Sequence, residues 1–250
     1  MKSYYSSLSL RLEFNTLIFA VHMQTIILLH GALGSKEQMS PLANLLSIHF
    51  NVHILEFSGH GKSEDSENEF KIPQMAQELN DYIQFQQIDK PFIFGYSMGG
   101  YVALYHAFLF QDKTEKIITL ATKFDWNLES ATKEANQLNP DIMQTQIPAY
   151  VELLEIRHGS KWSNVVQKTA RMMIELADSN LLNPNTLSTI KTTSLICLGD
   201  KDKMVTFIES EQTASALQNA TLKILKDTPH PFERVKLDNL AFEIIEFCNS

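Results

Sequence analysis

Short apolar runs alternate with segments of helical periodicity along most of the chain. In residues 72–83, for example, apolar side chains recur at intervals of three or four, as on one face of a helix. The apolar runs have no polar alternation, which is typical of strands buried on both faces. They cover residues 25–29, 51–57, 91–94, 116–121 and 193–198. Strands that alternate with helices in this way predict an α/β protein with a doubly wound, mostly parallel sheet.

The alternation stops at residue 124 and resumes near residue 191. Between these points the pattern is helical, over 128–138, 142–158 and 162–177, and prolines separate the segments. We interpret 124–190 as a helical cap inserted into a core made of 23–123 and 191–250. After the cap we expect the strand 193–198, a helix over 206–217, a strand over 222–225 and a closing helix that includes Phe232, Leu240, Ile244 and Phe247. In the first part of the core, Pro41 predicts the first turn of a helix that starts near Ser40.

The N-terminal residues 1–22 do not join this pattern. The apolar run Leu17–Val21 is too short to cross a bilayer, and it lacks the layout of a signal peptide. Met23 directly precedes the first clear strand. We therefore treat 1–22 as an extension of uncertain order.

Composition excludes several classes of partner. The chain has 250 residues, 44% of them hydrophobic, which is enough for one sizeable core. Its net charge of -8 argues against binding to nucleic acids or anionic membranes, because both repel an acidic surface. The two cysteines do not form a disulfide framework, so we expect a reducing compartment and a cytoplasmic protein.

The segment Gly95-Tyr96-Ser97-Met98-Gly99-Gly100 carries the clearest chemical signal. It lies between the predicted strand 91–94 and the apolar, helical segment 101–108. A G-x-S-x-G sequence in this position is typical of a sharp strand-to-helix turn that exposes a nucleophilic serine. The N–H of Met98 would lie at the start of the helix, where it can face a developing oxyanion.

A serine nucleophile needs a base, and the base needs an acid to orient it. His230 follows the last predicted strand between two prolines, whereas His158 falls in the predicted cap, so we favour His230 as the base. Two aspartates follow the strand before it. Asp202 lies further into the loop and can turn back toward the histidine, while Asp200 adjoins the strand end and is expected to brace the turn. Asp125 is a less favoured alternative.

Together with two further motifs, these residues give the chain a resemblance to the α/β-hydrolase superfamily, of the small capped esterase type, from Thr25 to the C-terminus. His30-Gly31 is similar to the family's HG loop, and Gly59-His60-Gly61-Lys62-Ser63 to its G-H-G-x-S turn. The resemblance implies that the second oxyanion donor is the N–H of Ala32. It also implies the family's fold and an acyl-transfer activity.

Two positions depart from the family pattern. Glu56 stands where an aspartate usually leads into the G-H-G turn, and Pro229 stands where a glycine usually precedes the catalytic histidine. Both positions shape loops around the site rather than its chemistry. We expect His30 and His60 to be structural and to hydrogen-bond the loop backbone.

We therefore predict a serine hydrolase that cleaves a carboxylic ester, or a related acyl bond, of a small and mainly apolar substrate. Ser97, Asp202 and His230 would form the triad, and the N–H groups of Ala32 and Met98 the oxyanion hole. This chemistry requires no metal and no organic cofactor. The expected partner is a small-molecule acyl substrate, and the sequence leaves the oligomeric state open.

Aromatic side chains of the predicted cap are candidates for the substrate pocket, namely Trp126, Tyr150 and Trp162. Arg157 and His158 could meet an anionic substrate, but we expect them to form a solvated helix end.

Two alternatives to an esterase stay open. Carbon-carbon hydrolases and lyases of cofactor biosynthesis use the same triad. The similar lyases of the menaquinone pathway carry an arginine at the position of Tyr101, and this difference slightly disfavours that type of lyase. A ligand-binding protein on a hydrolase scaffold is the other alternative. Such proteins often lack part of the triad, and this chain retains every member.

Overall fold

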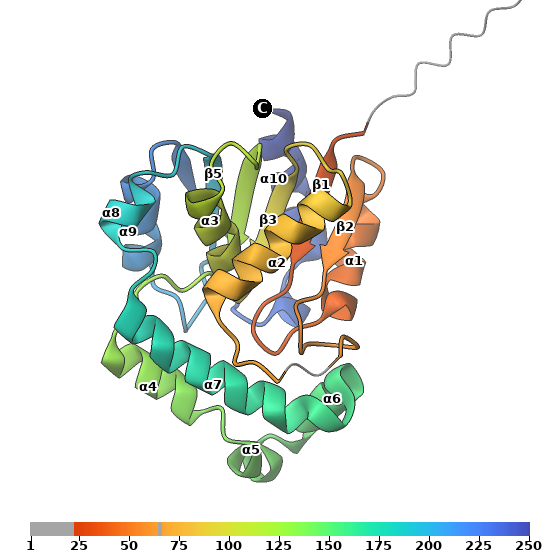
Figure 1. Ribbon diagram of the computed structural model, residues 1–250, viewed down its shortest axis with the longest axis vertical. Helices are drawn as coiled ribbons and strands as arrows, with labels where there is room; N and C mark the ends of the chain where they lie inside the picture. The colour runs from red at the N-terminus through yellow and green to blue at the C-terminus, as the bar shows by residue number, and fades with distance from the viewer. Residues whose placement is uncertain (1–22, 65–66) are drawn as a thin grey trace, which may run out of the picture.

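The computed structural model describes residues 23–64 and 67–250, so the predicted extension 1–22 lies outside it. Within these residues, six parallel strands form one sheet in the order β2-β1-β3-β4-β5-β6 (Figure 1). The strands are β1 (Thr25–Leu29), β2 (Asn51–Leu55), β3 (Phe92–Tyr96), β4 (Lys116–Leu120), β5 (Thr193–Gly199) and β6 (Ala220–Leu225). The predicted doubly wound parallel sheet is confirmed.

Helices cover both faces of the sheet because successive side chains of each strand point to opposite faces. Ile26 and Leu28 pack into the layer of α1 and α10, whereas Ile27 and Leu29 pack into the layer that includes α2 and α3. These helices are α1 (Lys36–Leu46), α2 (Ile72–Phe85), α3 (Met98–Leu109) and α10 (Leu237–Asn249), and α9 (Phe207–Ala216) packs on β5 and β6. Cys197 and Cys248 are free, buried thiols in the layer of α1 and α10.

The inserted helices lie together at one end of the sheet, at the bottom of Figure 1. They are α4 (Leu128–Asn136), α5 (Pro140–Gln146), α6 (Pro148–His158), the 3-10 turn η1 (Gly159–Lys161) and α7 (Trp162–Ser179). A further short helix, α8 (Pro184–Leu187), packs against α9 of the core instead. Because the strands are parallel, this end collects the loops that follow all of their carboxyl ends.

Three helix predictions were wrong in detail, each next to a proline. The segment predicted as one helix over 142–158 is two helices, because Ile147 leaves helical geometry and Pro148 starts α6. Pro41 lies inside α1, which begins at Lys36. Phe232 follows Pro231 in the 3-10 turn η2 (Phe232–Arg234), and α10 begins only after it.

In the described part of the chain, no helix combines the length and the apolar character needed to span a membrane.

The turn after β3 depends on glycines at two positions where backbones approach closely. A Cβ atom on Gly95 would lie 2.4 Å from Gly100 N and Gly99 C, and one on Gly99 would lie 2.5 Å from the Leu29 carbonyl oxygen. Backbone atoms cannot yield as the end of a flexible side chain can. Glycine at these positions lets α3 start directly against β3 and β1.

We expect Gly95→Ala to lower the free energy of unfolding by about 2 kcal/mol or more, because the added methyl group overpacks a backbone contact. Urea unfolding followed by circular dichroism measures this. Gly159→Ala is the matched control, because its Cβ meets no atom within 4 Å and only its positive φ of 64° opposes the change. That variant should cost about 1 to 3 kcal/mol through backbone strain alone, because φ of 64° with ψ of −147° is a conformation that essentially only glycine adopts. Equal stability of Gly95→Ala and the wild type would contradict the close approach.

Candidate active site

Ser97 lies at the tight turn between β3 and α3. Its φ of 50° and ψ of −115° are strained for a residue with a side chain, and such strain concentrates at functional sites. The turn is fixed on both sides, because Ser97 N donates to Leu120 O at 2.8 Å and the Thr122 hydroxyl donates to Ser97 O at 3.0 Å. The predicted strand, sharp turn and helix are therefore present.

The structure brings Asp202 and His230 together. Asp202 Oδ2 lies 2.8 Å from His230 Nδ1, and the other carboxylate oxygen accepts hydrogen bonds from the amides of Met204 and Val205. The Asp202 side chain is 1% exposed and the His230 side chain 20%. Burial alone would raise the pKa of Asp202, but His230 and the two amides outweigh it and hold that pKa below its usual value. Asp202 is therefore a carboxylate that holds one imidazole nitrogen.

The other candidate acids serve elsewhere. Asp200 was predicted to brace its own turn, and the structure shows that it accepts a hydrogen bond from Thr228 N and so joins this turn to the histidine loop. Asp125 Oδ1 lies 3.5 Å from the side-chain nitrogen Nδ2 of Asn127, in the turn before α4. Neither carboxylate contacts His230.

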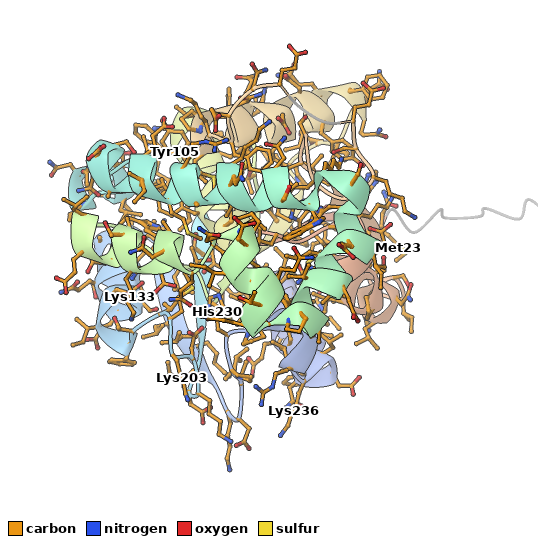
Figure 2. The ribbon with its side chains drawn as sticks, turned by 90° about the horizontal axis from the view of Figure 1, so that it is seen from below. Met23, Tyr105, Lys133, Lys203, His230 and Lys236 are labelled. Atoms are coloured by element: carbon orange, nitrogen blue, oxygen red, sulfur yellow. The ribbon has the colours of Figure 1, made fainter. Side chains whose placement is uncertain are left out.

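Tyr96 ties the histidine loop to the serine turn. Its hydroxyl donates to His230 O at 2.9 Å, and burial raises the pKa of this hydroxyl, which therefore stays protonated. The residue that precedes the serine thus holds the loop that carries the histidine. In Figure 2, which views the molecule from the side of the inserted helices, His230 lies near the middle of that face. The imidazole Nε2 makes no hydrogen bond within residues 23–64 and 67–250, and neither does the Ser97 hydroxyl.

The loop after β1 is held so that one backbone amide has a defined direction. Gly31 O accepts hydrogen bonds from His30 Nδ1 at 2.8 Å and Gly34 N at 3.0 Å. Because the peptide is trans, the N–H of Ala32 must point the opposite way from that carbonyl. In the part of the chain that the structure covers, neither Ala32 N nor Met98 N donates to another backbone group outside the regular elements. Both amides stay available to an oxyanion.

The cap is anchored to this same loop by Arg157 and His158. Arg157 Nη1 donates to Leu33 O at 2.7 Å and Nη2 to Glu233 at 2.9 Å, while His158 Nε2 donates to Leu33 O at 3.1 Å. His158 Nδ1 accepts a hydrogen bond from Gly61 N at 2.9 Å, which requires the neutral ring. The expectation of a solvated helix end was wrong, because both side chains are buried between α6 and the loops they bind.

The G-H-G turn is structural, as predicted. His30 Nε2 accepts from Phe57 N at 3.2 Å, and His60 Nδ1 lies 3.3 Å from Ser58 O. Glu56, which replaces the usual aspartate, accepts from the amides of Lys36 and Lys62 and so joins the start of α1 to this turn.

A cavity of about 30 Å³ lies beside Ser97, with room for no more than a few water molecules. Ala32 and Met98 line it together with Trp126, whose ring nitrogen donates to Lys123 O at 3.1 Å. Tyr150 and Trp162, the other two predicted pocket residues, do not line this cavity. Its remaining wall is mostly flexible and apolar, with Met172, Met173, Leu176 and Met204 among the lining side chains.

The sequence analysis did not anticipate several residues of this cavity, and Lys123 is the charged one among them. Its position could have indicated it, because it follows the end of β4 by three residues and β4 pairs with β3, which carries the serine. A larger groove of about 500 Å³ lies between α1 and α6, on the outer side of Arg157 and Glu233, and shares no lining residue with the Ser97 cavity.

The fold and the site define the class of protein. The family model described as alpha/beta hydrolase fold matches residues 24–180, which is more than half of the chain. The chain belongs to this family.

Individual relatives are similar over shorter stretches. Esterase YbfF of Escherichia coli (strain K12) is 34% identical over 95 residues, which are 38% of this chain and 37% of that protein. A 2-succinyl-6-hydroxy-2,4-cyclohexadiene-1-carboxylate synthase of Photorhabdus laumondii is 33% identical over 82 residues, or 33% of this chain and 29% of that protein. A thermophilic esterase from Thermogutta terrifontis superposes with a TM-score of 0.74 at 20% identity, over 90% of this chain and 89% of that one. The structural likeness concerns the fold alone.

Buried histidines make the stability of the protein depend on pH. Burial lowers the pKa of His30, His106 and His158 from the usual 6.5 to about 4, so the folded protein keeps them neutral while the unfolded chain protonates them. Where the unfolded state binds more protons, stability falls as pH falls. The contribution of these three histidines to the free energy of unfolding is complete above pH 6.5. It is lost progressively as the pH falls from 6.5 to about 4.

We expect the free energy of unfolding in urea to decrease over this pH window. The slope of the free energy of unfolding against pH reports how many protons are taken up on unfolding. His106→Gln, on α3 and away from the site loops, should reduce that number by about one. An unchanged slope in this variant would show that His106 is already protonated in the folded protein.

Proposed function

We propose that this protein is a serine hydrolase that cleaves a carboxylic ester, or a related acyl bond, of a small and mainly apolar substrate through an acyl-enzyme. The observation that carries the proposal is the buried Asp202–His230 pair, which is tied through Tyr96 to the turn that carries Ser97. The similarity to esterases over part of the chain supports the same reaction class.

In this mechanism His230 Nε2 takes the Ser97 proton as the hydroxyl attacks the carbonyl carbon. Asp202 holds Nδ1, which selects the tautomer and stabilises the imidazolium that forms. The amides of Ala32 and Met98 stabilise the tetrahedral oxyanion, each by about 2.7 to 4 kcal/mol if they resemble other oxyanion donors. His230 then protonates the leaving group, and water that it activates releases the acyl group.

A carbon-carbon hydrolase or a lyase of cofactor biosynthesis is a second candidate, and the lyase is favoured by the similarity over 82 residues to a 2-succinyl-6-hydroxy-2,4-cyclohexadiene-1-carboxylate synthase. Tyr101 occupies the position where we expected such lyases to carry an arginine. Its hydroxyl accepts a hydrogen bond from Leu182 N at 3.1 Å, and burial raises its pKa to about 12, so it supplies no positive charge. We therefore place the esterase first.

Ser97→Ala, His230→Ala and Asp202→Asn should each lower kcat for p-nitrophenyl esters by roughly 10^4-fold, because each removes one member of the proton relay. Asp200→Asn is the matched control. Its side-chain oxygen can still accept the hydrogen bond from Thr228 N, so turnover should stay near that of the wild type.

Two outcomes would overturn this proposal. Loss of activity in Asp200→Asn but not in Asp202→Asn would exchange the roles of the two acids. If the folded wild type hydrolyses no ester and is also not captured by a fluorophosphonate at Ser97, a protein that only binds its ligand is favoured.

The small cavity predicts a preference for short acyl groups. Within a p-nitrophenyl series from acetate to dodecanoate, kcat/KM for butyrate should exceed that for octanoate by roughly tenfold or more. The reason is that a short acyl chain already fills the small apolar cavity, so each further methylene lowers kcat/KM. Met172→Ala should move the optimum to longer chains. Met143→Ala removes the same side chain from a buried cap position outside the cavity, so the optimum should stay. An identical shift in both variants would contradict the assignment of the acyl pocket.

A further inference from the structure

Lys123 lines the Ser97 cavity, and the mechanism above does not use it. The residue is 9% exposed and lines the cavity together with the proposed nucleophile and both proposed oxyanion donors. It is the one charged residue in a lining that is otherwise made of apolar and hydroxyl-bearing side chains. A buried ammonium group is costly unless it has acceptors for its protons.

The partners of the Lys123 ammonium leave part of its hydrogen-bonding capacity unused. Its Nζ atom lies 3.4 Å from Glu209 Oε2, which is long for a charge-assisted hydrogen bond. The same nitrogen lies 5.7 Å from the ring centroid of Trp126. An ammonium has three N–H donors, and no other acceptor for them is present within the described ranges 23–64 and 67–250.

Glu209, in contrast, has hydrogen-bond donors other than the lysine. Its carboxylate accepts hydrogen bonds from Phe124 N at 3.2 Å and from the Thr206 hydroxyl at 3.1 Å. These two donors keep the carboxylate satisfied when the flexible lysine side chain turns toward a ligand. The ion pair therefore holds the ammonium near Trp126, which lines the cavity, and does not use all of the ammonium's N–H donors.

The position of the cavity indicates which part of a substrate would meet this cation. His230 protonates the leaving group in the proposed mechanism, so the leaving group must lie on the side of His230. His230 does not line the cavity, whereas Ser97 and both oxyanion amides do. The cavity therefore faces the acyl part of the substrate.

We propose that Lys123 binds a carboxylate at the far end of the acyl group, so that the substrates are monoesters of short dicarboxylic acids. This inference rests on the proposed hydrolase function and refines it: the acyl chain is short and apolar along its length and ends in a negative charge. The small cavity requires a short chain, and the mostly apolar wall strengthens the attraction between the ammonium and the carboxylate.

The test compares two methyl esters of equal chain length, monomethyl succinate and methyl butyrate. For the wild type, kcat/KM should be roughly tenfold or more higher for the succinate ester. Lys123→Met keeps the length of the side chain but removes the charge, and should lower kcat/KM for the succinate ester by roughly tenfold to a hundredfold while leaving the butyrate ester little changed.

Lys168→Met is the matched control. Lys168 is a buried lysine on α7 that lies 5.6 Å from the ring centroid of Phe70, and it does not line the Ser97 cavity. It should leave the preference between the two esters unchanged. The proposal would be overturned if kcat/KM of the wild type were the same for both esters, or if Lys123→Met lowered kcat/KM equally for both.

Glu209→Gln keeps the hydrogen-bond acceptor but removes the competing negative charge. It should lower KM for monomethyl succinate and not for methyl butyrate, an improvement that misfolding cannot produce. An unchanged or higher KM for the succinate ester would count against the assignment.

A binding measurement separates this inference from the proposed hydrolysis. Succinate should raise the thermal midpoint of Ser97→Ala but not that of Ser97→Ala/Lys123→Met. If succinate stabilises the protein in this way and no ester is hydrolysed, the carboxylate site stands and the hydrolase proposal fails. If methyl butyrate is hydrolysed but succinate neither binds nor is preferred as an ester, the carboxylate site fails and the hydrolase stands.

Discussion

The close packing of the turn between β3 and α3 is the constraint on which the rest of the site depends. Gly95 and Gly99 allow the start of α3 to contact the backbones of β3 and β1, and Ser97 is held between them in a strained conformation. Hydrogen bonds from the β4 side, to and from Leu120 and Thr122, keep this conformation in place. Every other group of the candidate site is positioned relative to this turn.

Groups from distant parts of the chain meet at the turn because parallel strands place all their carboxyl ends at one edge. The loop after β1 carries Ala32, the loop after β5 carries Asp202 and the loop after β6 carries His230. Tyr96 then joins two of these loops directly through the hydrogen bond from its hydroxyl to His230 O. The sheet supplies the coarse positions, and a few buried hydrogen bonds supply the precision that proton transfer requires.

The cap contributes to the site in two different ways. From one side, α7 and the segment before α4 close the cavity with methionines and Trp126. From the other, Arg157 and His158 at the end of α6 hold the carbonyl of Leu33, the residue next to the proposed oxyanion donor Ala32. The geometry of the oxyanion loop therefore depends on how the cap is seated. This dependence also explains why these two polar side chains are buried.

The sequence by itself determined the parallel sheet and the place of the serine turn, because both depend on local patterns of apolar runs and glycine spacing. It also predicted the candidate triad from the loops at strand ends, with Asp202 favoured over Asp200 and Asp125 as the acid. It indicated that Asp202 can turn back toward His230, and the structure shows why they meet: β5 and β6, the strands before them, are adjacent. Only the tertiary structure decided which cap side chains reach the cavity, where Tyr150 and Trp162 lie, and that Lys123, Arg157 and His158 are buried. Those outcomes depend on how α4 to α7 pack over the sheet edge. Helical periodicity specifies which face of a helix is apolar, but not which loop that face will cover.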